Sequence, residues 1–178
     1  MKLSDEVKRK FSVQSYASQS RIDGVEVGEL KRHVDEGGSL TELGRLAAGT
    51  LAGMSAFTVQ QVNYSELAPG AIKAFHLHLR QTDVWFVPPA DRVLCVLIDA
   101  RAGSRTEGVR SRVLLGDGRS QLLRIPPGVA HGARNLASTT GRIIYFTDLH
   151  FTCEPDTCDE GRLAWDFAGA EIWNIARE

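Results

Sequence analysis

Short runs of apolar residues, many of them β-branched and separated by turn-forming residues, dominate the chain from residue 56 onward. The separators are clusters of Gly, Pro, Ser and Asp, such as Pro126-Pro127-Gly128. Runs of this length between such clusters are typical of β-strands. The expected strands cover residues 56–62, 73–79, 84–87, 93–99, 113–115, 121–125 and 142–146. Because many short strands at this spacing favour a sandwich or a barrel, the pattern predicts an all-β fold.

The same pattern predicts some of the connections. The clearest hairpin signal joins residues 113–115 to residues 121–123 through the glycine-rich turn at 116–119. Residues 25–34 fit either a short strand or a helical turn, so the sequence leaves both open there. A short helical piece is expected near the end of the chain, at residues 171–176.

Composition and charge argue against several kinds of partner. The 178 residues include 21 Lys and Arg against 22 Asp and Glu, a formal net charge of −1, which gives no basic surface for nucleic acid or for a membrane. No apolar run approaches the ~18–20 residues of a membrane span, and the charged start lacks a signal-peptide core. We therefore expect a cytoplasmic protein of one domain. Its expected parts are an N-terminal extension at 1–50, a β core at 51–150 and a C-terminal segment at 151–178.

Two histidine-containing segments carry the candidate chemistry. His76 and His78 lie two residues apart in an expected strand, so their side chains point to the same side. The second segment reads Pro126-x-Gly128-x-x-His131-x-x-x-Asn135, in which a tight turn presents His131 at the start of the next strand. His76 and His78 are therefore expected to face one interior.

These segments resemble the two sequence motifs of the cupin superfamily, which implies a cupin-type jelly roll (a double-stranded β-helix). The resemblance also implies that the two segments lie on facing strands and that His76 and His131 point into the same barrel. A narrower resemblance covers nearly the whole chain. Five segments, in the right order, are similar to motifs of the dTDP-4-dehydrorhamnose 3,5-epimerase family. They are residues 35–45, 73–76, 99–106, 125–132 and 159–166, which include the sequences Ile125-Pro126-Pro127-Gly128-Val129-Ala130-His131-Gly132 and Glu160-Gly161-Arg162-Leu163-Ala164-Trp165-Asp166.

The resemblance implies an enzyme of carbohydrate biosynthesis that acts on a nucleotide-linked, most often dTDP-linked, 4-keto-6-deoxysugar. Members remove a proton next to the ketone and return one from the opposite face, a reaction that requires no cofactor. They form homodimers, in which the N-terminal extension could add a strand to the partner subunit.

The resemblance also implies roles for individual residues. His76 matches the base and Asp166 the carboxylate that orients it, while His131 matches a second pocket histidine. Glu42 and Arg45 fall in a segment that helps to hold the nucleotide.

Arg101 matches an arginine that either contacts a pyrophosphate or is structural. Lys73 replaces an arginine of the family. It is expected to contact substrate together with His78, Gln81 and Asp83.

Two departures from the family pattern bear on the reaction. Asp83 stands where the family usually has a lysine, so a cation has become an anion. The catalytic tyrosine expected shortly after Tyr145 is missing, which leaves His150 and Tyr145 as candidate acids. This pattern favours epimerisation at a single carbon, or another isomerisation of a keto sugar, over double epimerisation.

Two other classes of function remain open at the level of sequence. His76, His78, Asp83 and His131 together could ligate a divalent transition metal, as in a metal-dependent cupin enzyme. A cupin that binds a small molecule without turning it over would also fit. We take the metal-free pocket as the leading interpretation, because His76 cannot serve at once as a metal ligand and as a free base.

Overall fold

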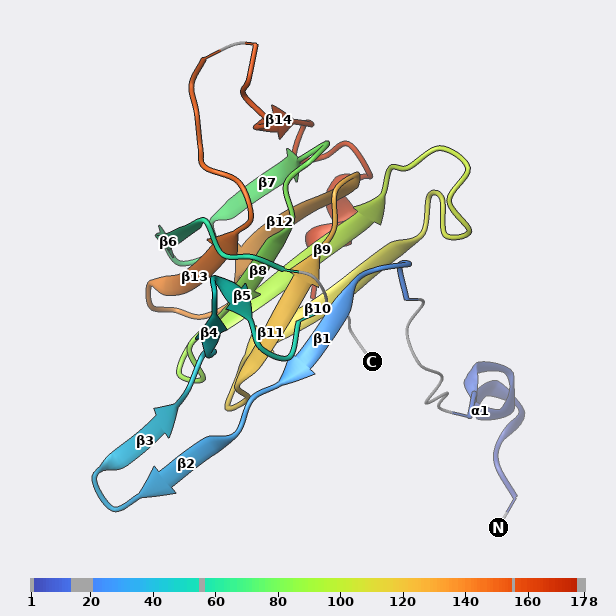
Figure 1. The fold of residues 1–178 in the computed structure, drawn as a ribbon. Coiled ribbons are helices and arrows are strands. Elements are labelled where there is room, and N and C mark those ends of the chain that lie inside the picture. The colour runs from blue at the N-terminus through green and yellow to red at the C-terminus, as the bar shows by residue number, and fades with distance from the viewer. Residues whose placement is uncertain (1, 14–20, 55–56, 155, 176–178) are drawn as a thin grey trace.

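Two five-stranded antiparallel sheets form the body of the computed structural model, which describes residues 2–13, 21–54, 57–154 and 156–175 (Figure 1). The first sheet has the order β1 (Glu26–Glu29), β11 (Gln121–Ile125), β8 (Asp83–Phe86), β13 (Gly141–Thr147) and β6 (Gln61–Leu67). The second has the order β10 (Arg110–Gly116), β9 (Arg92–Asp99), β12 (Val129–Asn135), β7 (Ile72–Leu77) and β14 (Gly161–Arg162). The all-β prediction is confirmed, and the two sheets face each other without closing into one hydrogen-bonded barrel.

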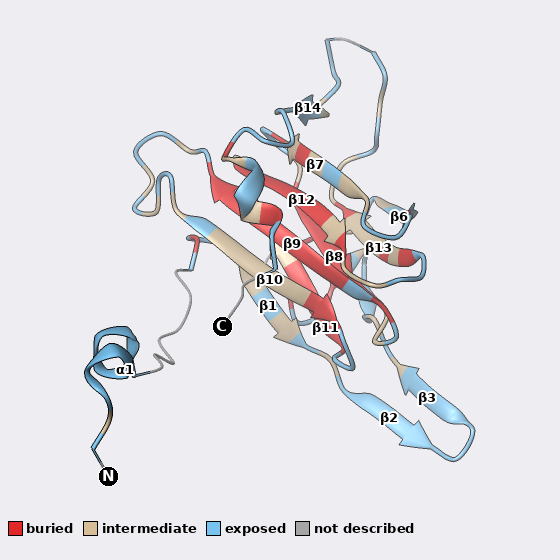
Figure 2. Cartoon of the chain, turned by 180° about the vertical axis from the view of Figure 1, so that it is seen from behind, coloured by how far each residue is buried: buried red, intermediate tan, exposed pale blue. Residues whose placement is uncertain are grey.

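The central strand β9 shows how the alternation of side chains builds the core. Its odd-numbered residues Val93, Cys95 and Leu97 face the other sheet, where they pack with residues such as Trp85 and Leu123. Its even-numbered residues point to the opposite side, where the C-terminal segment covers them. Figure 2 shows β9 as an almost continuous buried strand, which is why it reads as an unbroken apolar run in the sequence.

The expected hairpin between residues 113–115 and 121–123 is wrong. Strand β10 pairs with β9, whereas β11 pairs with β1 and β8 in the other sheet. The turn between them is a corner that carries the chain from one sheet to the other. Gly116 makes this corner with a φ of 75°, and the next amide, that of Asp117, donates to the carbonyl of Asp91. A turn signal therefore marked the reversal correctly but not the partner strand.

The N-terminal part of the chain contains short strands. Residues 31–45 form a mostly exposed segment that we call the exposed arm. Residues 25–34, left open by the sequence, contribute β1 and β2 (Arg32–Asp35). Strand β2 pairs with β3 (Gly38–Thr41) in a hairpin that projects from the body (Figure 1), and β4 (Leu46–Ala47) pairs with β5 (Thr50–Leu51). The helix α1 (Asp5–Lys10) precedes them.

The remaining expectations concern the two ends of the β core. The strand expected at 56–62 is shorter at its start than predicted, since β6 begins only at Gln61. Residues 57–60 belong to no named strand, and residue 56 lies outside the described residues. The expected C-terminal helical piece is the 3-10 turn η1 (Ala170–Trp173), and residue 176 again lies outside the described residues. No helix in the described part of the chain is long and apolar enough to span a membrane.

Candidate active site

A cavity of about 460 Å³ opens between the two sheets, within the range of small-molecule sites. Strands β6, β7, β8, β12, β13 and β14 all contribute to it. The lining residues are Ser65, Leu67, Lys73, His76, His78, Gln81, Asp83, Trp85, Ala133, Ile143, Tyr145, Glu160 and Arg162. The predicted residues Lys73, His76, His78, Gln81, Asp83 and Tyr145 therefore share one cavity.

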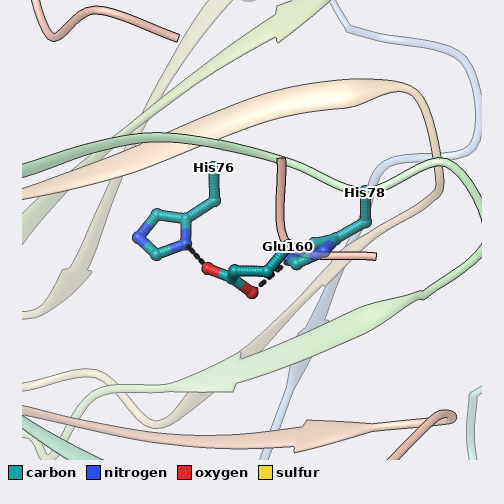
Figure 3. Close-up of side chains that lie close together, drawn as sticks. All are labelled: His76, His78 and Glu160. Carbon is teal, nitrogen blue, oxygen red and sulfur yellow. Dashed lines mark hydrogen bonds and ion pairs between the residues drawn. The ribbon is translucent and has the colours of Figure 1, made fainter. Parts of the chain in front are cut away.

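His76 is held between a carboxylate and a guanidinium. Its Nδ1 lies 2.6 Å from Oε1 of Glu160 (Figure 3). Its Nε2 lies 3.1 Å from Nη1 of Arg162. An Nδ1–H that donates to Glu160 leaves the Nε2 lone pair to accept from Arg162. The hydrogen bond from His76 lowers the pKa of Glu160, so the carboxylate is ionised at neutral pH. The ring is thereby fixed in orientation and tautomer.

The expected pairing of His76 with Asp166 is not what the structure shows. Strand β14 pairs with β7 and places Arg162 opposite His76. The carboxylate that contacts the imidazole is that of Glu160, the residue just before β14. Asp166 lies four residues after Arg162, in an exposed turn, where its carbonyl accepts from the amide of Gly169. The carboxylate at His76 is Glu160, which the sequence analysis missed. The signal was present in the acidic residues directly before Gly161.

His131 is buried deeper, next to the lining residues, and only 2% of it is exposed. Register places it directly opposite His76 on β7, and the two rings stack with centroids 5.8 Å apart. Its Nδ1 lies 3.0 Å from the carbonyl of Val129, and its Nε2 lies 3.5 Å from Oδ2 of Asp83. The ring edge of Trp85 closes the remaining side. Both motif histidines thus meet in one place, as the sequence indicated.

Asp83 is a buried carboxylate rather than a surface anion. Oδ1 accepts from the Gln81 amide at 2.7 Å, and Oδ2 accepts from the Trp85 indole at 3.0 Å. Burial acts to raise the pKa of Asp83, but the neighbouring His131, together with His78 and the hydrogen bond from Trp85, lowers it to about 2. Asp83, which replaces the lysine of the family, is therefore a buried and ionised residue of the cavity.

Tyr145 and Lys73 line the same cavity from different strands. Burial raises the pKa of the Tyr145 phenol, and the nearby Asp83 adds to the effect, so the group stays protonated and can donate a proton. The ammonium of Lys73 is anchored by Ser65 and by the carbonyl of Glu66, at 3.3 and 2.7 Å. The cavity therefore holds a neutral acid and a cation in addition to the histidines.

Besides Asp166 and His131, four more predicted site residues lie outside the lining of this cavity. His150 is exposed, because the chain turns outward after β13 ends. Glu42 and Arg45 pair with each other at 2.8 Å on the exposed arm. Arg101 is structural in this chain: it pairs with Asp99 at 2.8 Å and donates to the carbonyl of Asp23, which fastens the N-terminal segment to the loop after β9.

The four residues proposed as one metal-ligand set do not form one cluster. His78, Asp83 and His131 offer ligand atoms that all lie within 4.8 Å of one another. His76 belongs instead to a second group with His78 and Glu160. Since Nδ1 of His76 is engaged by Glu160, the structure separates a paired imidazole from a set of three potential ligands.

Two facing antiparallel sheets that present histidines and carboxylates to one cavity are the architecture of the cupin fold. The sequence profile of the dTDP-4-dehydrorhamnose 3,5-epimerase family matches residues 19–172. The chain belongs to this family, whose members are sugar epimerases and isomerases.

Individual relatives agree with this assignment. The chain is 41% identical to the spore coat polysaccharide biosynthesis protein SpsL of Bacillus subtilis, over 82% of this chain and 91% of that protein. It is 29% identical to the probable low-salt glycan biosynthesis epimerase Agl13 of Haloferax volcanii, over 82% and 89% of the two chains. The dTDP sugar isomerase structure from Desulfovibrio desulfuricans matches with a TM-score of 0.72 at 26% identity, over 87% of this chain and 91% of that one.

Proposed function

We propose that the chain is an epimerase that acts on a dTDP-linked 4-keto-6-deoxysugar and uses His76 to remove the proton next to the ketone. The main support for this proposal is the His76–Glu160 pair at the wall of the cavity. A neutral imidazole with a fixed Nε2 lone pair suits the removal of a weakly acidic C–H proton. The names of the relatives support a sugar substrate, and one of them is called a dTDP sugar isomerase.

The residues of the cavity suggest the course of the reaction. Substrate would displace the Arg162 guanidinium from Nε2 of His76, which is feasible because the Arg162 side chain is 59% exposed. As the ring accepts the proton, the Glu160 carboxylate would stabilise the imidazolium. The enolate oxygen would be stabilised by the ammonium of Lys73. Tyr145, a protonated phenol in the same cavity, would return a proton to the carbon from the other face.

We further propose that only one carbon is inverted. Where the family usually has a lysine, this chain has the ionised Asp83, which would repel rather than stabilise a second enolate. The second cation of the cavity, Arg162, is paired with Glu160 at 3.2 Å, so Lys73 and Tyr145 would serve a single cycle of removal and return. Product analysis by NMR would distinguish inversion at one carbon from inversion at two.

The nucleotide is expected to be held in part by a second copy of the chain. Glu42 and Arg45 lie on the exposed arm rather than at the cavity of their own chain, so they could reach a substrate only in a neighbouring subunit. This supports a homodimer in which the arm crosses to the partner. Sedimentation of the purified chain, with and without dTDP, tests the dimer directly.

The decisive test of the reaction is exchange with solvent deuterium. Incubation with dTDP-4-keto-6-deoxyglucose in D₂O should place deuterium next to the ketone, as detected by NMR. The His76→Gln variant should lose this exchange, whereas the control His33→Gln, on exposed strand β2, should keep it. Binding of the nucleotide sugar with no exchange in the wild type would show a binding protein instead of an enzyme.

A further inference from the structure

The turn between β7 and β8 is held by a side chain from a distant segment of the chain. Three successive backbone amides of this turn donate to one carboxylate, that of Asp159. The donors are Leu79, Arg80 and Gln81, at 3.1, 2.9 and 2.8 Å. Successive backbone N–H groups of this kind form a concave site for an anion. Here the anion belongs to the segment that joins β13 to β14.

Asp159 is a mostly buried carboxylate, with only 11% of its side chain exposed. Burial acts to raise the pKa of Asp159, but the hydrogen bonds from the three amides lower it below its usual range. Hydrogen bonds to an ionised acceptor are roughly twice as strong as those between neutral groups. The guanidinium of Arg80 adds a further contact to the same segment, because it donates to the carbonyl of Thr157 at 2.7 Å. The turn and the segment before β14 are therefore fastened together.

The backbone around Asp159 is fixed as well. Its carbonyl accepts from Nδ1 of His78 at 2.7 Å. On the other side of Glu160, Leu163 exchanges two backbone hydrogen bonds with Phe75, each of 3.0 Å. Glu160 therefore lies between two anchors, of which Asp159 is the one directly beside it in the chain.

Glu160 depends on such anchors, because its own surroundings hold it weakly. The adjoining strand β14 has only two residues, and the Glu160 side chain is 27% exposed. Even so, Oε1 of Glu160 must stay 2.6 Å from Nδ1 of His76 to fix the tautomer of the ring. Displacement of a catalytic group by about 1 Å can cost about 100-fold in rate.

We propose that Asp159 is a positioning residue that holds Glu160 against His76. Asp159 is not among the residues that line the cavity, so it would act on the reaction only through Glu160. This inference rests on the proposed epimerase reaction, because it concerns the carboxylate that supports the proposed base. A role confined to the stability of the turn would instead affect the enzyme whether or not Glu160 is present.

A double-mutant cycle that combines Asp159→Asn with Glu160→Gln separates these two roles. Asn has the shape of Asp but carries no charge and offers one acceptor oxygen in place of two. With dTDP-4-keto-6-deoxyglucose, Asp159→Asn should lower kcat by about 10-fold and leave KM nearly unchanged. In the Glu160→Gln background the same substitution should change kcat by less than about twofold, because the group through which it acts is already lost.

The matched control is Asp148→Asn. Asp148 accepts from the amide of Thr82 in the same turn, at 2.7 Å, but it is distant from Glu160 in the chain. This variant should change kcat by less than about twofold in either background. Circular dichroism identifies a variant that fails to fold. If Asp159→Asn fails, Asp159→Glu takes its place in the cycle, since it keeps the carboxylate but lengthens the side chain.

The tautomer of His76 gives a second readout that does not require turnover. Imidazole ¹⁵N NMR should place the wild-type proton on Nδ1, and both Asp159→Asn and Glu160→Gln should shift part of the population to the Nε2–H form. Asp148→Asn should keep the wild-type tautomer. An equal loss of kcat in both backgrounds, or a tautomer unaffected by Asp159→Asn, would overturn the positioning role. A wild type that shows no deuterium exchange, but whose tautomer responds to Asp159→Asn, would support this role and contradict the proposed reaction alone.

Discussion

Replacing Glu160 by Gln removes the negative charge beside His76 while the size of the side chain is kept. In the proposed reaction the His76 ring becomes positive as it takes the sugar proton. Two unit charges 4 Å apart interact by about 4 kcal/mol at an effective dielectric constant of about 20. That value suits this pair, whose side chains are 23% and 27% exposed. With about half of the proton transferred at the barrier, about 2 kcal/mol is lost, which corresponds to about a 30-fold decrease in kcat.

The assay follows deuterium exchange and product formation by NMR at saturating dTDP-4-keto-6-deoxyglucose. KM should change much less than kcat, because the lost interaction develops only as the proton moves. The matched control is Glu36→Gln, in the exposed turn between β2 and β3. A Glu160→Gln variant whose kcat stays within about threefold of the wild type, while His76→Gln is inactive, would refute the charge argument.

Three further predictions concern the acid, a corner and the acid stability of the fold. Tyr145→Phe should keep deuterium exchange but lose most of the inversion in the NMR assay; equal loss of both would give Tyr145 another role. Gly116→Ala should lower the free energy of unfolding in urea by about 2–4 kcal/mol, because its φ is 75° and an added Cβ would overlap the Asp91 carbonyl oxygen; a loss below about 1 kcal/mol would contradict this. Hydrogen bonds from Arg101 hold the pKa of Asp99 well below its usual range, so the stability they provide is present above the unfolded-state pKa of about 3.9 and is lost as pH falls below it. Asp99→Asn should therefore be less stable at neutral pH and lose less stability on acidification, as urea unfolding at several pH values would show.

Local patterns in the sequence identified most strands and part of the site. The apolar run at 93–98 marked most of β9, because this part of the strand is buried on both faces. The two histidine segments correctly indicated that His76 and His131 share an interior, since each motif combines a strand with a turn that fixes its direction. These successes rest on information contained within about ten residues of chain.

The incorrect predictions have a different cause. They concern contacts between segments that are far apart in the sequence, which local patterns do not specify. Gly116 and its neighbours signalled a reversal, but whether the next strand joins the same sheet depends on the packing of both sheets. Glu160 reaches His76 only because β14 pairs with β7, 84 residues earlier in the chain. Arg101 matched a family position, yet its bidentate contact with Asp99 shows a role in holding a loop.

The two-residue strand β14 carries Arg162 and follows Glu160. Residues near the C-terminus help to hold the segment that contains it. Trp173 is 1% exposed and packs against Phe75 of β7 with ring centroids 5.2 Å apart, which pins the C-terminal segment behind the second sheet. If this segment detached, the two sheets could persist while the base lost its carboxylate. In the proposed reaction, the fraction of molecules able to remove a proton would then depend on this local opening, which the packing of Trp173 opposes.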